Sequence, residues 1–289
     1  MSAFTTWVAG ARPRTLPAAV VPVAVGTGAA AADGSPVWWR APVALVVALA
    51  LQVGVNYAND YSDGVRGADA DRVGPVRLVG SGAATPRSVL VAAIISFAVG
   101  AVAGLILAAV TTWWLVLVGG VAIAAAWLYT GGAVRYGYRG LGELAVFLFF
   151  GVVAVVGTSY VLLEKVTWTA VVASLPVGLF ACALLVVNNL RDRDSDARAG
   201  KRTLAVLVGD QHTRELYAAL MLLPFPLAAV LALRSPFALL AFLATTLAAT
   251  PVRRVLRNTV GMELIDVLRQ TGMAQLAYGL LLAVGLVIG

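Results

Sequence analysis

The chain has 289 residues, of which 61% are hydrophobic and 12% are charged, and its formal net charge is +7. Soluble domains carry about 25% charged residues, so the composition excludes an ordinary soluble protein and indicates an integral membrane protein. One cysteine, Cys182, excludes an internal disulfide. We expect residues 1–289 to form a single transmembrane domain.

Apolar stretches of about 20 residues recur along the chain, which is the length of a membrane-spanning helix. Turn-forming residues separate them, as at 33–36 and 234–236. The predicted fold class is therefore an all-α polytopic membrane protein with about nine transmembrane helices. In chain order these are expected at residues 16–32, 41–60, 87–110, 112–130, 143–163, 168–190, 213–233, 236–251 and 270–288.

The basic residues fall almost entirely on one side of these predicted spans. The sparse side holds only Arg40, Lys165 and Arg234, and the rich side holds the other 18 of the 21 lysines and arginines. The positive-inside rule places the rich side in the cytoplasm, so the N-terminus is expected inside and the C-terminus outside. The positive charge thus has a topological explanation, and no nucleic-acid partner is expected.

Two Asp-rich clusters end the second and sixth predicted spans. Residues 56–63 read NYANDYSD, and residues 188–196 read NNLRDRDSD. Each cluster begins with Asn and has Asp four residues later, a spacing that places both side chains on one helix face. Carboxylates at the end of an apolar helix are costly to keep unless they have a function.

Converging carboxylates repel one another unless cations neutralise them. Mg²⁺ prefers one or two carboxylates together with water and substrate phosphate oxygens. The clusters therefore predict one Mg²⁺–diphosphate site built from both halves of the chain. The residues predicted to hold Mg²⁺ are Asp60, Asp63, Asp192 and Asp196. Asn56 and Asn188 are expected to support them, and Lys201 and Arg202 to neutralise phosphate charge. For either cluster alone, a solvated loop with helix-capping Asp is the alternative.

At these residues the chain resembles the intramembrane aromatic prenyltransferases of the UbiA superfamily. Residues 12–28, 59–82 and 188–209 resemble, within it, the branch that acts on 1,4-dihydroxy-2-naphthoate in menaquinone biosynthesis. One departure is Gly67, which stands where many members carry a third Asp in the first motif. The next acids are Asp69 and Asp71, which are expected in a loop that caps the site.

The resemblance implies a nine-span enzyme of the cell membrane, surrounded by the lipid bilayer, with Mg²⁺ as cofactor and an active site facing the cytoplasm. The implied reaction transfers a polyprenyl group from polyprenyl diphosphate to 1,4-dihydroxy-2-naphthoate with decarboxylation, giving demethylmenaquinol, diphosphate and carbon dioxide. Lys201, Arg72 and Arg77 are expected to contact diphosphate or form the cap. Further candidates for binding the naphthoate carboxylate or the diphosphate are Arg12, Arg14, Arg135, Tyr138 and Arg139. For these arginines, membrane topology and lipid headgroups are an equally good explanation.

Three alternatives remain at this point. The first is a UbiA-type enzyme with another aromatic acceptor. The second is a CDP-alcohol phosphotransferase, whose signature also begins Asp-x-x-Asp-Gly, as at residues 60–64, but requires a second Asp pair in the same segment. The third is a transporter, although transporters place their acids near mid-span, whereas the acids here cluster at span ends.

Overall fold

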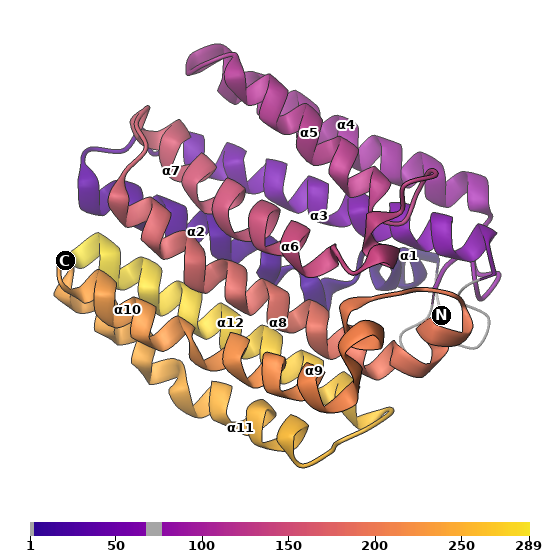
Figure 1. The fold of residues 1–289 in the computed structure, drawn as a ribbon. Coiled ribbons are helices and arrows are strands. Elements are labelled where there is room, and N and C mark those ends of the chain that lie inside the picture. Colours follow the sequence, from indigo (N-terminus) through magenta and orange to yellow (C-terminus); the bar gives the residue numbers. More distant parts are fainter. Residues whose placement is uncertain (1–2, 68–76) are drawn as a thin grey trace.

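A computed structural model describes residues 3–67 and 77–289, and every regular element in those ranges is a helix (Figure 1). The predicted all-α class is confirmed. Asp69, Asp71 and Arg72, which are predicted to belong to a cap, lie outside the described residues.

The helices follow one another with short connections. Those of the N-terminal half are α1 (Ala3–Ala11), the 3₁₀ turn η1 (Pro13–Thr15), α2 (Pro17–Asp33), α3 (Arg40–Val65), α4 (Pro86–Val110), α5 (Trp114–Leu128), the 3₁₀ turn η2 (Tyr136–Arg139), α6 (Gly142–Val146), the π-helix η3 (Phe147–Val153) and α7 (Ala154–Leu163). Those of the C-terminal half are α8 (Trp168–Arg198), α9 (Leu204–Leu222), α10 (Pro224–Ala232), the 3₁₀ helix η4 (Pro236–Ala244), α11 (Thr245–Leu256) and α12 (Glu263–Ile288).

Each predicted span overlaps an apolar helical segment. In the described residues, seven helices are long and apolar enough to cross a membrane, and there are up to eight if the bent pair of residues 4–15 and 17–33 counts as one span. The fourth predicted span corresponds to α5, a helix of only 15 residues. The chain is therefore a multi-pass membrane protein, and the count of nine spans stays a prediction.

The two helices that carry the Asp clusters run further than their apolar length predicted. α3 continues to Val65 rather than 60, and α8 continues to Arg198 rather than 190. At 1.5 Å per residue, α3 is about 39 Å long and α8 about 46 Å, which exceeds the roughly 30 Å hydrocarbon core of a bilayer. Both Asp clusters consequently lie on helix, and Asp63, Asp192 and Asp196 stand in the turns beyond the predicted spans.

Helix α8 lies at the centre of the bundle. It packs against α2, α9, α10 and α12. Of its apolar, membrane-spanning stretch, 72% is buried inside the protein. Beside it, α2 and α12 approach so closely that a Cβ on Gly28 would lie 2.7 Å from the carbonyl oxygen of Ala283. Small residues permit such close backbone contact, which stabilises helix pairs in membranes. In Figure 1, α4 and α5 form one edge of this bundle.

The two ends of the bundle differ in charge, as the sorting of basic residues predicted. The N- and C-termini lie at opposite ends (Figure 1). Arg40 begins α3 and donates to the carbonyl oxygens of Val110 and Val161 and to Glu164. The Arg234 guanidinium lies over the ring of Trp168, at the start of α8. Arg40 and Arg234, from the side with few basic residues, thus lie at one end of the bundle. The Asp clusters lie at the other end, where α3 and α8 finish.

Candidate active site

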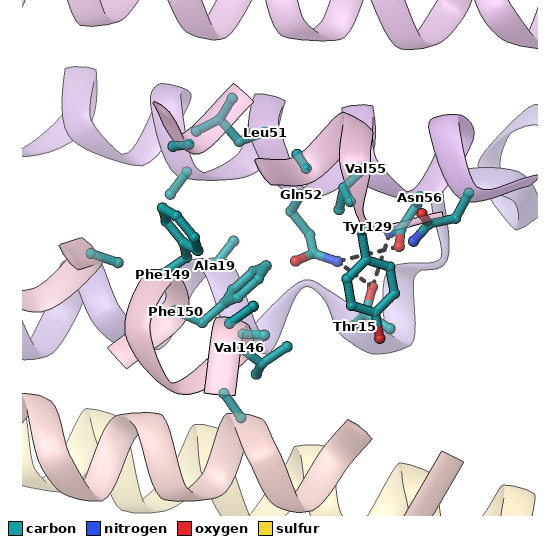
Figure 2. Close-up of a pocket in the computed structure, with 18 of the residues that line it drawn as sticks. Thr15, Ala19, Leu51, Gln52, Val55, Asn56, Tyr129, Val146, Phe149 and Phe150 are labelled. Atoms are coloured by element: carbon teal, nitrogen blue, oxygen red, sulfur yellow. Dashed lines mark hydrogen bonds between the residues drawn. The ribbon is translucent and has the colours of Figure 1, made fainter. Parts of the chain in front are cut away.

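Both Asp clusters open on one cavity of about 1020 Å³. Its walls are largely apolar and include Leu51, Val55, Val146, Phe149 and Phe150 (Figure 2). Of the predicted site residues, those that line it are Arg12, Arg14, Asn56, Asp63, Arg77, Tyr138, Asn188, Asp192, Asp196 and Lys201. The polar end of the cavity therefore combines residues from both halves of the chain.

Lys201 joins the two motifs. Its Nζ lies 3.4 Å from Oδ2 of Asp63 and 3.8 Å from Oδ1 of Asp196. It also stands 4.7 Å above the ring of Tyr138, whose hydroxyl donates a 2.5 Å hydrogen bond to Oδ1 of Asp63. Lys201 is only 8% exposed, so little solvent screens its charge from the two carboxylates.

The chain places Lys201 by ending α8 sharply. Gly200 has φ +72°, a left-handed conformation that glycine adopts without steric cost. The N–H of Gly200 donates to the carbonyl of Ala197, and that of Lys201 to the carbonyl of Asp196. These two bonds form a Schellman motif, which turns the chain back so that Lys201 lies beside the last turns of the helix that it follows.

Arg191 is a site residue that sequence reasoning missed. Its guanidinium makes two 2.7 Å hydrogen bonds to the two carboxylate oxygens of Asp192 and a third, at 2.8 Å, to Oδ1 of Asn188. Its side chain is 1% exposed, and it lines the cavity. In the sequence, membrane topology alone accounts for Arg191. Its position directly before Asp192 is the one signal there that points to the site.

Three of the four aspartates predicted to hold Mg²⁺ line the cavity, namely Asp63, Asp192 and Asp196. Within the described ranges, no group of three or more acidic, His or Cys side chains is arranged to hold a metal by itself. Instead, Lys201 and Arg191 neutralise Asp63, Asp196 and Asp192. The donor set nevertheless fits Mg²⁺, because it consists of hard carboxylate and amide oxygens and Mg²⁺ takes its remaining ligands from substrate phosphates and water.

Asp60 has a structural position rather than a place at the cavity. Its carboxylate is fully buried and accepts hydrogen bonds from the backbone N–H groups of Leu78, at 2.8 Å, and Val79, at 3.0 Å. It does not line the cavity. Asp60 thereby fixes the segment that carries Arg77, and its predicted role as a metal ligand is not supported by its surroundings.

Asn59, rather than Asp60, lies at the cavity wall. It lines the cavity, and its Oδ1 accepts a 2.8 Å hydrogen bond from Thr130. Asn59 and Asp63 have the same four-residue spacing as Asn188 and Asp192 on α8. Sequence reasoning missed Asn59 because Asn56 and Asp60 show that spacing first. Both Asn59 and Asp63 line the cavity, whereas of the other pair only Asn56 does.

Replacing Asp60 with Ala should lower the stability of the protein rather than remove a metal ligand. The substitution leaves the buried N–H of Leu78 without an acceptor, at about 1–3 kcal/mol, and also frees the partly buried N–H of Val79. Asp60→Asn keeps one acceptor. We expect the apparent Tm of the detergent-purified protein to fall most in Asp60→Ala and less in Asp60→Asn. Mg²⁺ binding measured by calorimetry well below that Tm should persist. Loss of Mg²⁺ binding at unchanged Tm would return Asp60 to the ligand set.

Asn56 supports the N-terminal segment rather than the acidic end. Its Nδ2 donates to the carbonyl of Ala11 and to Oγ1 of Thr15, at 2.9 and 3.1 Å. These bonds tie α3 to the turn that carries Arg12 and Arg14, both of which line the cavity. Asn56 therefore supports the site by holding the turn that carries Arg12 and Arg14, rather than by supporting the aspartates.

The segment of residues 135–139, which contains η2, contributes one of its three predicted residues to the cavity. Tyr138 lines it, whereas Arg135 and Arg139 do not. The Arg135 guanidinium lies 5.8 Å from the centre of the Tyr138 ring, and Arg139 is exposed. Tyr136 also lines the cavity; burial raises the pKa of its phenol to about 12, so at neutral pH it keeps the proton that it donates to the carbonyl of Ala125.

A helical bundle with an apolar cavity that ends in carboxylates, amides and cations suits an intramembrane enzyme whose lipid substrate has an anionic head. The comparisons with known proteins name that class. Residues 19–262 match the model of the UbiA prenyltransferase family, so the chain belongs to that family. The membership confirms the predicted resemblance and excludes the transporter and CDP-alcohol phosphotransferase alternatives.

Several relatives match along almost their whole length. The 1,4-dihydroxy-2-naphthoate octaprenyltransferase of Mycobacterium tuberculosis is 54% identical, over 100% of this chain and 99% of that protein. The protein of the same name from Escherichia coli is 34% identical, over 99% of this chain and 96% of its own.

Solved structures share the fold at low sequence identity. A UbiA homolog from Archaeoglobus fulgidus bound to DMAPP and Mg²⁺ superimposes with a TM-score of 0.62 at 15% identity, covering 96% of this chain and 99% of that one. The apo structure of a UbiA homolog from Aeropyrum pernix K1 gives 0.67 at 17% identity, covering 94% and 97%. At these identities the likeness concerns the fold alone.

Proposed function

We propose that this chain transfers a polyprenyl group from a polyprenyl diphosphate to 1,4-dihydroxy-2-naphthoate, with decarboxylation, giving demethylmenaquinol, diphosphate and carbon dioxide. The observation that carries the proposal is Lys201, which joins Asp63 and Asp196 at the polar end of an apolar cavity. The names of relatives that match over their full length support the acceptor.

The polar end of the cavity binds the diphosphate. Lys201, Arg77 and Arg12 line it and supply positive charge. The residues that would hold Mg²⁺ are Asn59, Asp63, Asn188, Asp192 and Asp196. Bound Mg²⁺ supplies a Lewis acid that stabilises the negative charge of the departing diphosphate. The same cations and donors favour the transition state because that charge grows as the diphosphate leaves.

The apolar walls protect the reactive fragment. When the C–O bond of the substrate breaks, its electron pair leaves with the diphosphate and an allylic carbocation remains. Water would quench that cation, so the cavity must stay dry. The aromatic side chains of Phe149 and Phe150, with Leu51 and Val55 from α3, line this region (Figure 2). The same apolar surface accommodates the polyprenyl chain.

The aromatic acceptor completes the reaction. The ring carbon that bears the carboxylate attacks the cation and forms the new C–C bond. The bond to the carboxylate then breaks, carbon dioxide departs, and the electron pair left behind restores the aromatic ring. Carbon dioxide leaves where a proton would otherwise have to be removed, so this carbon needs no general base.

We further propose that the protein lies in the cell membrane with the polar end of the cavity facing the cytoplasm. The supporting observation is the charge asymmetry between the two ends of the bundle, because the Asp clusters share their end with most of the basic residues. A cytoplasmic opening gives a water-soluble naphthoate direct access from the compartment in which metabolic intermediates are made.

The test of the proposed function is an acceptor comparison in membranes that contain the protein. Polyprenyl diphosphate plus 1,4-dihydroxy-2-naphthoate should release diphosphate and give a prenylated, decarboxylated product, and EDTA should stop the release. With 4-hydroxybenzoate as acceptor, release should stay at the level of membranes without the protein. Transfer to 4-hydroxybenzoate alone would assign the chain to another acceptor, and release with neither compound would contradict the proposal.

A further inference from the structure

Gln52 is a polar residue in the apolar part of the cavity wall. It lies on α3 between Leu51 and Val53, is 5% exposed and lines the cavity (Figure 2). Its amide nitrogen has two partners, whereas its Oε1 is fully buried and has no hydrogen-bond partner within the described part of the chain. Buried polar atoms are nearly always paired, so this oxygen indicates a partner that the protein itself does not supply.

The neighbouring hydrogen bonds fix which atom of the amide is left unpaired. The Thr15 hydroxyl donates its hydrogen to the carbonyl of Arg12 at 2.9 Å, so its oxygen can only accept. It accepts from Nε2 of Gln52 at 3.0 Å and from Nδ2 of Asn56 at 3.1 Å. Asn56 Nδ2 also donates to the carbonyl of Ala11, which leaves Oδ1 of Asn56 to accept from Gln52 at 3.4 Å. Rotating the Gln52 amide would place oxygen against oxygen at both contacts.

The ligand that satisfies this oxygen must bring a hydrogen-bond donor. A polyprenyl chain is a hydrocarbon and has none, so it would leave Oε1 unpaired, whereas a ring hydroxyl pairs with it. In 1,4-dihydroxy-2-naphthoate the 1-hydroxyl lies next to the carboxylate and bonds to it internally. The 4-hydroxyl, on the opposite side of the ring, is the donor that remains available.

The depth of Gln52 also suits the acceptor. Gln52 precedes Asn59 by seven residues on α3, which is about 10 Å along the helix axis. The amide oxygen therefore lies below the polar end, where a ring must stand to meet the first carbon of the prenyl group. Tyr129, Phe149 and Phe150 line the same cavity (Figure 2), and aromatic side chains stack well on a planar bicyclic ring.

We propose that Oε1 of Gln52 accepts a hydrogen bond from the 4-hydroxyl of the naphthoate acceptor and so positions the ring for attack. This inference rests on the proposed function and assigns one contact within it. A site that hydrogen-bonds a substrate hydroxyl discriminates against an analogue that lacks it, because the oxygen then stays unpaired. Gln52 is therefore a specificity-determining residue for the acceptor.

The experiment compares 1,4-dihydroxy-2-naphthoate with 1-hydroxy-2-naphthoate, which lacks only the 4-hydroxyl. For the wild type, the inhibition constant of the monohydroxy compound should exceed the KM of the dihydroxy compound by about 10-fold or more, as loss of one buried hydrogen bond implies. Gln52→Met keeps a side chain of similar length without the amide. It should raise the acceptor KM to near that inhibition constant and leave the KM for polyprenyl diphosphate unchanged.

Thr15→Val is the matched control variant. It removes the bond to Nε2 of Gln52 but keeps Oε1, so a general disturbance of the α3–η1 contact appears in it as well. We expect Thr15→Val to retain the preference for the 4-hydroxyl. If Gln52→Met keeps the wild-type preference, or loses it only to the same degree as Thr15→Val, the contact is overturned while the proposed function stands. If the wild type prenylates no naphthoate, the proposed function itself is overturned.

Discussion

Replacing Asp192 with Ala should lower the rate of prenyl transfer by at least about 10³-fold while the protein stays folded in the membrane. The Asp192 carboxylate lies at the polar end of the cavity and would hold Mg²⁺ against the diphosphate. Lewis-acid stabilisation of a transition state is worth several kcal/mol, and each 1.36 kcal/mol is about tenfold in rate. The measurement is diphosphate release at saturating Mg²⁺, with folding checked by the apparent Tm.

Asp194→Ala is the control for that prediction. Asp194 lies on α8 only two residues further along, but its side chain is 80% exposed and pairs with Arg193. Its replacement changes the net charge by the same amount without touching the cavity, so activity should stay close to that of the wild type. If a folded Asp192→Ala protein released diphosphate at nearly the wild-type rate, Asp192 would not be a residue that holds Mg²⁺.

Lys201→Met should move Mg²⁺ binding and turnover in different directions. The ammonium group neutralises Asp63 and Asp196, so its removal leaves both carboxylates more attractive to a divalent cation. Mg²⁺ binding to the protein alone should be at least as tight as in the wild type. Turnover should fall by about 10²-fold or more, because one fixed charge that stabilises the departing diphosphate is lost.

The two quantities are measured by calorimetric titration with Mg²⁺ and by diphosphate release. Arg202→Met is the matched variant, because Arg202 follows Lys201 directly but is exposed and does not line the cavity. It should resemble the wild type in both assays. If Lys201→Met instead lost Mg²⁺ affinity and turnover together, Lys201 would be an organiser of the carboxylates rather than a diphosphate contact.

The sequence predicted the positions of the helices better than their ends. Apolar length places α3 and α8 correctly, because burial in lipid requires apolar side chains. It cannot reveal that α3 continues to Val65 or that α8 continues to Arg198, since a helix that has left the hydrocarbon region can carry any side chain that favours helix. Asp63, Asp192 and Asp196 lie in those added turns.

The sequence predicted only part of the site, because spacing alone does not show which helix face meets the cavity. Charge and spacing at the ends of two apolar spans identified Asp63, Asp192, Asp196 and Lys201, all of which line the cavity. Helical spacing could not choose between the register of Asn56 with Asp60 and that of Asn59 with Asp63. That choice depends on the segment after the first motif, whose N–H groups at Leu78 and Val79 take both oxygens of Asp60.

Two further site residues have signals of unequal strength in the sequence. Gln52 is a lone amide inside an apolar span, and polar residues at such positions are costly and usually functional, so the sequence alone marks it. Arg191 is harder to recognise, because arginines on the basic side of a membrane protein already have a topological explanation. Only its three hydrogen bonds to Asp192 and Asn188 distinguish it.

The contact between Lys201 and Asp63 joins residues 138 positions apart, and this separation governs when the enzyme becomes active during its synthesis. At about 5–20 residues per second, a ribosome needs roughly 7–30 s to extend the nascent chain from the first motif to Lys201. Throughout that interval α3 can enter the membrane, but its acidic turn has no partner with which to bind diphosphate. We therefore expect a nascent or truncated chain that lacks Lys201 to have an incomplete diphosphate site.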